Sequence, residues 1–146
     1  MKNKKILLIG RSSSGKTTLL EHLLYGSSSC KKTQSVERVK NFIDTPGEYI
    51  EIPTFYNALI ITSYDADVIM LIGEAVEHHS IFPPNFGSAF RKPIIGVITK
   101  VDQGGSVDRA REHLQKAGAK DIFIIDYRKP KTLVELENYL SKDLLL

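Results

Sequence analysis

The feature that most constrains this chain is the segment 10–17, which reads GRSSSGKT and has the form G-x-x-x-x-G-K-[ST]. It follows the apolar run 6–9 and precedes a stretch, 16–25, whose leucines recur at helical spacing. A loop of this form between a strand and a helix curls so that successive backbone N–H groups point at one centre. Because the helix adds the partial positive charge of its N-terminus, the segment predicts a site for the phosphates of a nucleotide.

Each residue type in the loop has a chemical reason to be there. The Lys16 ammonium is expected to reach the β- and γ-phosphates, in a role that is both binding and catalytic. The Thr17 hydroxyl is expected to ligate Mg²⁺. The remaining phosphate contacts are expected from the rest of the loop and the start of the helix, at Gly10, Arg11, Ser12, Ser13, Ser14, Gly15 and Thr18.

Apolar runs alternate with amphipathic stretches along the chain. The pattern predicts strands at 5–9, 39–43, 68–73, 93–99 and 122–125, and helices at 16–25, 55–61, 107–117 and 132–144. For the helix over 55–61 we expect Thr54 as the N-cap. This β-α alternation predicts a single α/β domain over residues 1–146, a three-layer sandwich with a mostly parallel central sheet.

Two segments depart from the alternation. Residues 31–40 are polar, so we expect a loop or a short edge strand there. Residues 74–92 contain Pro83, Pro84 and Gly87, which argues against a regular helix.

Composition narrows the class of protein. The 146 residues are 42% hydrophobic and 25% charged, as is usual for a soluble domain. Cys30 is the single cysteine, so no internal disulfide forms and a reducing compartment is expected. The basic start 1–5 leads into only four apolar residues, too few for a signal peptide or a membrane helix. We expect a cytoplasmic protein that contacts no membrane and, because its basic residues are dispersed, no nucleic acid.

A second motif, Asp44-Thr45-Pro46-Gly47, follows the strand-like run 39–43. A carboxylate at the end of a strand can hold Mg²⁺, and a glycine amide close by can meet a γ-phosphate. The tetrapeptide alone indicates only a turn. Placed after a phosphate loop, it predicts Asp44 as a metal ligand and Gly47 as a phosphate contact.

A third motif, Thr99-Lys100-Val101-Asp102, follows the strand predicted at 93–99. The Asp102 carboxylate can accept two hydrogen bonds from the N1–H and N2–H₂ groups of guanine, and adenine offers no such pair of donors. The Lys100 stem can cover the base. With the two earlier motifs in this order, the pattern favours GTP and places Thr99, Lys100 and Asp102 in the nucleotide site.

Together the three motifs resemble a small Ras-like GTPase domain, and one branch in particular. The stretches Lys32-Thr33-Gln34, Asp44 to Tyr49, Asp65 to Ile69 and Ile95 to Asp102 resemble the ethanolamine- and propanediol-utilisation P-loop family of the EutP/PduV type. That resemblance implies a bacterial accessory of ethanolamine or propanediol degradation, often housed in protein-shelled microcompartments. It also implies that Thr33 closes over Mg²⁺ and the γ-phosphate as a metal ligand and catalytic residue. Since only residues 34–43 separate Thr33 from Asp44, the switch region must be shortened.

The chain departs from Ras-like proteins at two functional positions. Glu48 stands where they carry the glutamine that orients the attacking water. An ionised glutamate cannot donate a hydrogen bond, so hydrolysis is expected to be slow unless Glu48 acts as a base. The S-A-x element of the guanine site is replaced by Ile125-Asp126-Tyr127, which leaves ATP open as an alternative to GTP.

Three functions are consistent with these residues. The first is a GTP-hydrolysing switch. The second is an ATP-dependent kinase that phosphorylates a small carboxylate such as acetate. The third is a non-catalytic module in which nucleotide only gates binding to a microcompartment shell or to an enzyme of the pathway.

Overall fold

The strand that precedes the phosphate loop lies in the interior of the sheet. The computed structural model describes residues 5–25, 37–39 and 41–144. In it, β1 (Ile6–Ile9) pairs in parallel with β3 (Phe42–Asp44) on one side and with β4 (Val68–Glu74) on the other. All four residues of β1 are buried, as expected for a parallel strand that is covered on both faces.

Within the described residues, six strands form one sheet in the order β2-β3-β1-β4-β5-β6. β5 (Ile94–Thr99) and β6 (Asp121–Ile124) continue the parallel arrangement beyond β4. β2 (Glu37–Val39) is antiparallel to β3 and lies at the edge of the sheet. The predicted mostly parallel α/β sheet is therefore confirmed, and a short edge strand does occur within the polar segment 31–40.

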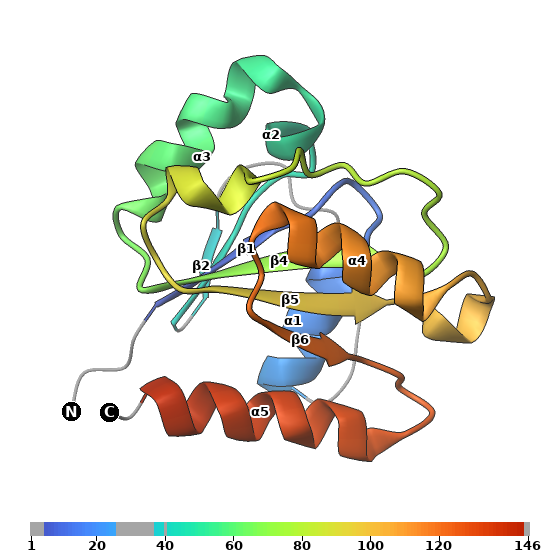
Figure 1. Ribbon diagram of the computed structural model, residues 1–146. Coiled ribbons are helices and arrows are strands. Elements are labelled where there is room, and N and C mark those ends of the chain that lie inside the picture. The colour runs from blue at the N-terminus through green and yellow to red at the C-terminus, as the bar shows by residue number, and fades with distance from the viewer. Residues whose placement is uncertain (1–4, 26–36, 40, 145–146) are drawn as a thin grey trace.

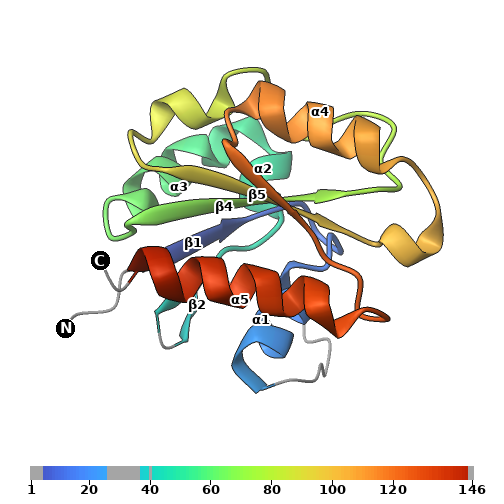
Figure 2. The same ribbon diagram turned by 60° about the horizontal axis from the view of Figure 1, so that its bottom comes forward.

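Helices cover both faces of the sheet (Figures 1 and 2). On one face, α1 (Lys16–Tyr25) and α5 (Pro130–Leu144) bury residues such as Leu19 and Leu136 against the sheet. On the other face, α3 (Tyr56–Ser63) and α4 (Val107–Ala117) bury Leu59 and Leu114 in a second cluster. The predicted three-layer sandwich is confirmed.

The sequence predicted the bounds of α1 and α4, and Gly118 ends α4. Gly118 has φ +113° and its N–H bonds back to the last turn, the left-handed helix end that glycine favours. In the segment 74–92, where no regular helix was predicted, the structure has the short 3₁₀ helix η2 (Phe86–Ala89). No described helix has the length and apolar character that crossing a bilayer requires.

Two local predictions were wrong. Residues 39–43 do not form one strand, because Val39 ends β2 and Phe42 begins β3. The two strands pair antiparallel, with Val39 opposite Phe42. A turn at Asn41 reverses the chain between them, and asparagine favours such turns.

Thr54 does not cap α3. It lies inside the 3₁₀ helix η1 (Pro53–Phe55), which runs directly into α3, and the cap position is taken by Phe55 without a side-chain hydrogen bond. Pro53 opens this turn, and the Phe55 N–H donates to the Ile52 carbonyl at 2.9 Å. Thr54 is therefore held within a turn, whereas a capping residue needs an extended backbone at the helix entrance.

Candidate nucleotide-phosphate site

The loop 10–15 connects the carboxyl end of β1 to the first residue of α1, and its turn depends on unusual backbone angles. Ser13 and Gly15 both have positive φ, at +63° and +92°. A Cβ on Gly10 would lie 2.7 Å from Ser14 Oγ and 3.0 Å from a side-chain carbon of β4, so a side chain there would have to displace one of them. The glycines that define the motif are thus required by the path of the backbone.

Lys16, Thr17 and Asp44 meet beside this loop. Lys16 Nζ lies 3.3 Å from Asp44 Oδ1, and the Thr17 hydroxyl donates to Asp44 Oδ2 at 3.4 Å. Lys16 and Asp44 are both buried. The fold therefore brings together residues that the sequence assigned to phosphate and metal from two separate motifs.

The oxygens at this point suit Mg²⁺. A hydroxyl and a carboxylate are hard donors, and in nucleotide sites Mg²⁺ commonly takes one or two protein oxygens and completes its shell with phosphate oxygens and water. In the described ranges no group of three or more His, Cys, Asp or Glu residues is placed to hold a metal ion by itself. The third predicted ligand, Thr33, lies outside the described residues.

Gly47 lies directly against the phosphate loop. A Cβ on Gly47 would come within 2.0 Å of Ser12 N and 2.5 Å of Ser12 Cα, so any side chain would force the two segments apart. The turn that contains Gly47 is held to β1, because the buried Thr45 hydroxyl donates to the Leu8 carbonyl at 2.8 Å. The second motif is therefore positioned by direct contact with the first.

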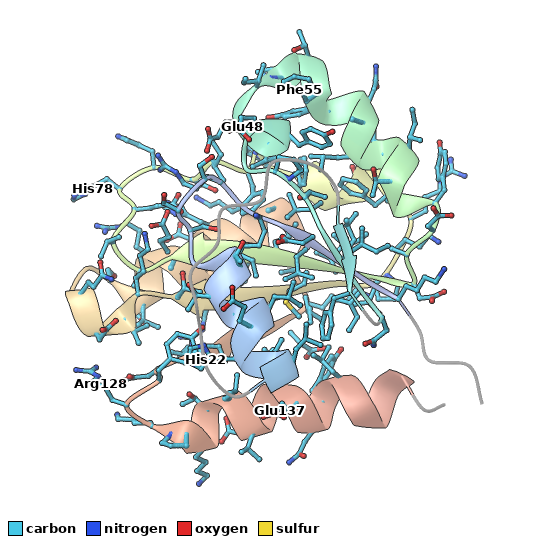
Figure 3. The ribbon with its side chains drawn as sticks, turned by 180° about the vertical axis from the view of Figure 1, so that it is seen from behind. His22, Glu48, Phe55, His78, Arg128 and Glu137 are labelled. Atoms are coloured by element: carbon cyan, nitrogen blue, oxygen red, sulfur yellow. The ribbon has the colours of Figure 1, made fainter. Side chains whose placement is uncertain are left out.

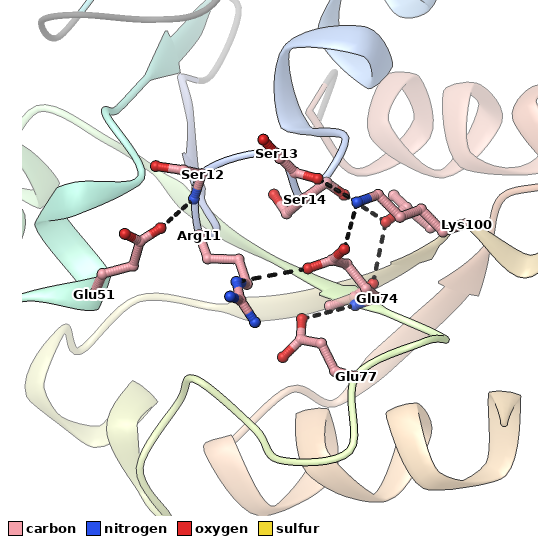
Figure 4. Close-up of polar contacts among 10 residues, drawn as sticks. Arg11, Ser12, Ser13, Ser14, Glu51, Glu74, Glu77 and Lys100 are labelled. Atoms are coloured by element: carbon pink, nitrogen blue, oxygen red, sulfur yellow. Dashed lines mark hydrogen bonds and ion pairs between the residues drawn. The ribbon is translucent and has the colours of Figure 1, made fainter. Parts of the chain in front are cut away.

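The short helix α2 (Glu48–Glu51) follows at once and carries two glutamates. Glu48, the predicted catalytic residue, opens the helix and is partly exposed (Figure 3). Glu51 is the one that contacts the loop, since its Oε1 accepts the Ser12 N–H at 2.5 Å (Figure 4). Glu51 was not predicted as a site residue because α2 itself was not predicted, and only one helical turn brings this carboxylate back to Ser12.

The third motif is bonded to the phosphate loop. The buried Thr99 hydroxyl donates to the Ser14 carbonyl at 2.6 Å, and Lys100 Nζ donates to the Ser13 carbonyl (Figure 4). Asp102 lies in the middle of η3 (Val101–Gln103) and is exposed. Thr99 and Lys100 thus fix the loop that presents Asp102 relative to the phosphate loop.

Glu74 is a further residue that sequence reasoning missed. It is the last residue of β4, it is buried, and its carboxylate lies 2.5 Å from Lys100 Nζ and 3.8 Å from Arg11 Nε (Figure 4). One carboxylate therefore joins a cation from the phosphate loop to a cation from the third motif. A signal was available, because Glu74 directly follows the apolar run 68–73 and a glutamate is rarely buried unless it is paired.

A second carboxylate lies behind Glu74. Glu77 accepts a hydrogen bond from the Glu74 N–H through Oε1 at 3.2 Å. Burial, together with the charge of Glu74, raises the pKa of Glu77 to about 7. The two glutamates line a pocket that also includes His113 and can hold about one water, with a volume near 10 Å³.

The strand end after β6 holds an ion pair where Ras-like proteins have S-A-x. Arg128 donates to both carboxylate oxygens of Asp126, at 2.9 Å from Nε and 2.8 Å from Nη2. These bonds lower the pKa of Asp126 to about 2. Beside them, Tyr127 stacks on His22 of α1 with ring centroids 4.0 Å apart. This edge is therefore built differently from the S-A-x element.

A match to a known family decides where the chain belongs. The PduV-EutP family model, described as ethanolamine utilisation - propanediol utilisation, matches residues 3–142. The chain belongs to this family.

Two curated members of the PduV-EutP family show the degree of similarity. The propanediol utilization protein PduV of Citrobacter freundii is 36% identical over 122 residues, which cover 82% of this chain and 81% of that protein. The protein named "Probable acetate kinase EutP" of Salmonella typhimurium is 35% identical over 142 residues, which cover 94% of this chain and 89% of that protein. Both similarities extend over most of each chain.

Solved structures of more distant proteins share the fold of this PduV-EutP member. The elongation factor SelB of Methanococcus maripaludis, solved with the GTP analogue GppNHp, gives a TM-score of 0.67 at 22% identity and covers 97% of this chain. Roco2 of Methanosarcina barkeri, solved with GDP, gives 0.67 at 19% identity and covers 99% of this chain. The matched regions are 34% and 50% of those longer chains, so the likeness establishes a shared domain fold.

Proposed function

We propose that this PduV-EutP member binds GTP together with Mg²⁺, hydrolyses it slowly, and serves as an accessory of bacterial ethanolamine or propanediol utilisation. The observation that supports this most is the meeting of Lys16, Thr17 and Asp44 beside a loop of phosphate-binding geometry. We further propose that the protein is cytoplasmic and contacts a microcompartment shell or an enzyme of the pathway.

In this proposal the loop amides and the Lys16 ammonium hold the β- and γ-phosphates. Thr17 and Asp44 hold Mg²⁺, and the family resemblance assigns Thr33 as a further ligand. The bound ion supplies positive charge against the phosphate oxygens. Gly47 contributes a backbone amide close to the terminal phosphate, since it is seated directly on the loop.

Guanine selection is assigned to Asp102. Its exposed carboxylate follows Thr99 and Lys100, which are bonded to the phosphate loop. We therefore propose that a base attached to phosphates in that loop lies within reach of Asp102. Because the S-A-x element is replaced by the Asp126–Arg128 ion pair, selection rests on Asp102 and ATP is the competing nucleotide.

Slow turnover follows from the acidic character of the segment after Gly47. Glu48 stands at the position of the water-orienting glutamine, and Glu51 is the residue that contacts the loop. An ionised carboxylate repels phosphate and has no N–H to donate, so neither glutamate can orient water as the glutamine amide does, and turnover is slow unless Glu48 acts as a base.

A second function has support from the relatives, since three of them carry the name "Probable acetate kinase EutP". In that reaction an acetate oxygen attacks the γ-phosphorus, the bond to the β–γ bridging oxygen breaks, and acetyl phosphate and a nucleoside diphosphate result. A poor reaction with water is compatible with this alternative because the γ-phosphoryl group is then preserved for another acceptor.

A competition assay on the purified chain tests the proposal. Affinities for GTP, GDP, ATP and ADP are measured with Mg²⁺ and again with EDTA, and turnover of labelled GTP and ATP is followed with and without acetate. We expect Mg²⁺-dependent preference for guanine over adenine nucleotides and slow release of inorganic phosphate from GTP. Acetate-dependent acetyl phosphate would instead support the kinase, and tight binding without turnover would support a nucleotide-gated module.

The substitution Lys16→Ala tests the phosphate-loop part of the proposal. We expect roughly 100-fold weaker triphosphate binding, because one charge-assisted anchor for two phosphates is lost. Lys131→Ala, which removes an exposed lysine from α5, should bind as the unmodified chain does. Circular dichroism checks that Lys16→Ala folds, and full retention of binding by the folded variant would refute the phosphate-loop account.

A further inference from the structure

One amide of the phosphate loop is engaged by an anionic group of the chain itself. The Ser12 N–H donates to Glu51 Oε1 at 2.5 Å, and both residues are drawn in Figure 4. Glu51 comes from α2, which is separated from the loop in the sequence by α1, β2 and β3. A carboxylate oxygen is a fair chemical stand-in for a phosphate oxygen, because both are anionic acceptors of backbone N–H groups.

The position of the Ser12–Glu51 contact indicates which phosphate of a bound nucleotide would lie near it. Gly47 is packed against Ser12, so the Ser12 amide lies next to the glycine that the proposed function places at the γ-phosphate. The Glu51 carboxylate therefore lies at the terminal-phosphate end of the loop. A nucleoside diphosphate does not extend to this end, whereas a triphosphate does.

Among the described residues, no cation forms an ion pair with Glu51. Lys16 is paired with Asp44, and both Arg11 and Lys100 are paired with Glu74. These three cations are thus already engaged by two carboxylates from other parts of the fold, Asp44 and Glu74. A terminal phosphate that approaches Ser12 thus meets the negative charge of Glu51 at close range.

We propose that Glu51 is a specificity-determining residue that biases the chain toward nucleoside diphosphate over triphosphate. The terminal phosphate must displace the Glu51 carboxylate from the Ser12 amide, and a diphosphate need not. This inference rests on the proposed function. It means that Glu51 influences whether the site retains the diphosphate or the triphosphate. A negative charge here opposes the γ-phosphate alone, so it changes the ratio of the two affinities.

The test is the ratio of the GDP and GTP dissociation constants, measured by calorimetry in Mg²⁺ buffer for the full chain and for Glu51→Gln. The glutamine keeps the size and the hydrogen-bond acceptor but removes the charge. We expect the ratio to shift toward GTP by roughly tenfold, with GDP affinity nearly unchanged. Glu51→Lys should shift it further in the same direction. Glu137→Gln, the same change on the exposed surface of α5 (Figure 3), should leave the ratio as it is.

The outcomes separate the two claims. If the unmodified chain binds neither nucleotide, the proposed function fails and this inference fails with it. If both nucleotides bind and the ratio is the same in the Gln and Lys variants, the inference alone is overturned. A parallel loss of GTP and GDP affinity would show a structural role for Glu51 and would likewise overturn it.

Discussion

At the scale of single residues, Lys100 shows how one side chain connects two parts of the site. Its backbone is left-handed, with φ +59°, which turns the chain sharply after β5. Its ammonium reaches the Ser13 carbonyl and lies 2.5 Å from Glu74. The loop that begins at Lys100 is thereby held to the phosphate loop, and Asp102 is carried with it.

Asp102→Asn should weaken the preference for guanine nucleotides. The amide can accept one hydrogen bond where the carboxylate accepts two, and its NH₂ group faces a donor of the base. We expect the ratio of ATP to GTP dissociation constants to fall by roughly 10- to 100-fold, read from competition binding. Asp108→Asn, an exposed position on α4, serves as the control. An unchanged ratio would remove Asp102 from base recognition.

At the scale of elements, the connection from β3 to α2 decides the shape of the site. Asp44 ends β3 beside Lys16, Gly47 contacts Ser12, and Glu51 returns to the same residue one helical turn later. Three contacts from one short connection therefore converge on the phosphate loop. The close approach is made at Gly47, where a side chain has no room.

Gly47→Ala should disrupt this connection. The added Cβ would lie 2.0 Å from Ser12 N, so the β3–α2 segment must move away from the loop. We expect a loss of about 1–3 kcal/mol in the free energy of unfolding and weaker triphosphate binding. Gly73→Ala is the matched control, because its Cβ would lie at an ordinary 3.4 Å from Leu114. Urea unfolding and calorimetry of both variants make the comparison, and equal behaviour would contradict the prediction.

At the scale of the whole molecule, the sheet separates two apolar clusters. Ile6, Leu8 and Met70 point toward α1 and α5, while Leu7 and Leu71 point toward α3 and α4. Alternate residues of the same strands thus serve different faces. The polar site lies at the edge where parallel strands end, outside both clusters.

The stability of the molecule should depend on pH through Glu77. Its folded pKa of about 7 lies above the ordinary value of 4.5, because of burial and then the neighbouring Glu74. The folded state therefore holds this proton where the unfolded chain has lost it, and the stabilisation present below pH 4.5 is lost as pH rises toward about 7.

Relative to Glu77→Gln, the unmodified chain should lose on the order of 1–3 kcal/mol of unfolding free energy between pH 4.5 and pH 7. Glutamine keeps the acceptor for the Glu74 N–H and carries no titrating charge, so the difference isolates this group. Urea denaturation at several pH values measures it. A constant difference across that range would show that Glu77 titrates normally.

The sequence by itself determined the layered α/β fold and the phosphate loop. The alternation of apolar runs and amphipathic stretches is a local pattern, and the motif of segment 10–17 requires its glycines wherever it occurs. The bounds of α1 and α4 followed for the same reason, since helical spacing and Gly118 are read from neighbouring residues.

Only the tertiary structure decided which charged groups meet around that loop. Glu51 reaches Ser12 through a helix whose single turn leaves no periodic signal, and Glu74 joins Arg11 to Lys100 across three separate segments. The turn at Asn41 that divides the expected strand, and the 3₁₀ helix that begins at Pro53, also could not be predicted from neighbouring residues. These features depend on contacts between residues far apart in the chain, and such contacts exist only once the sheet has brought its strand ends to one edge.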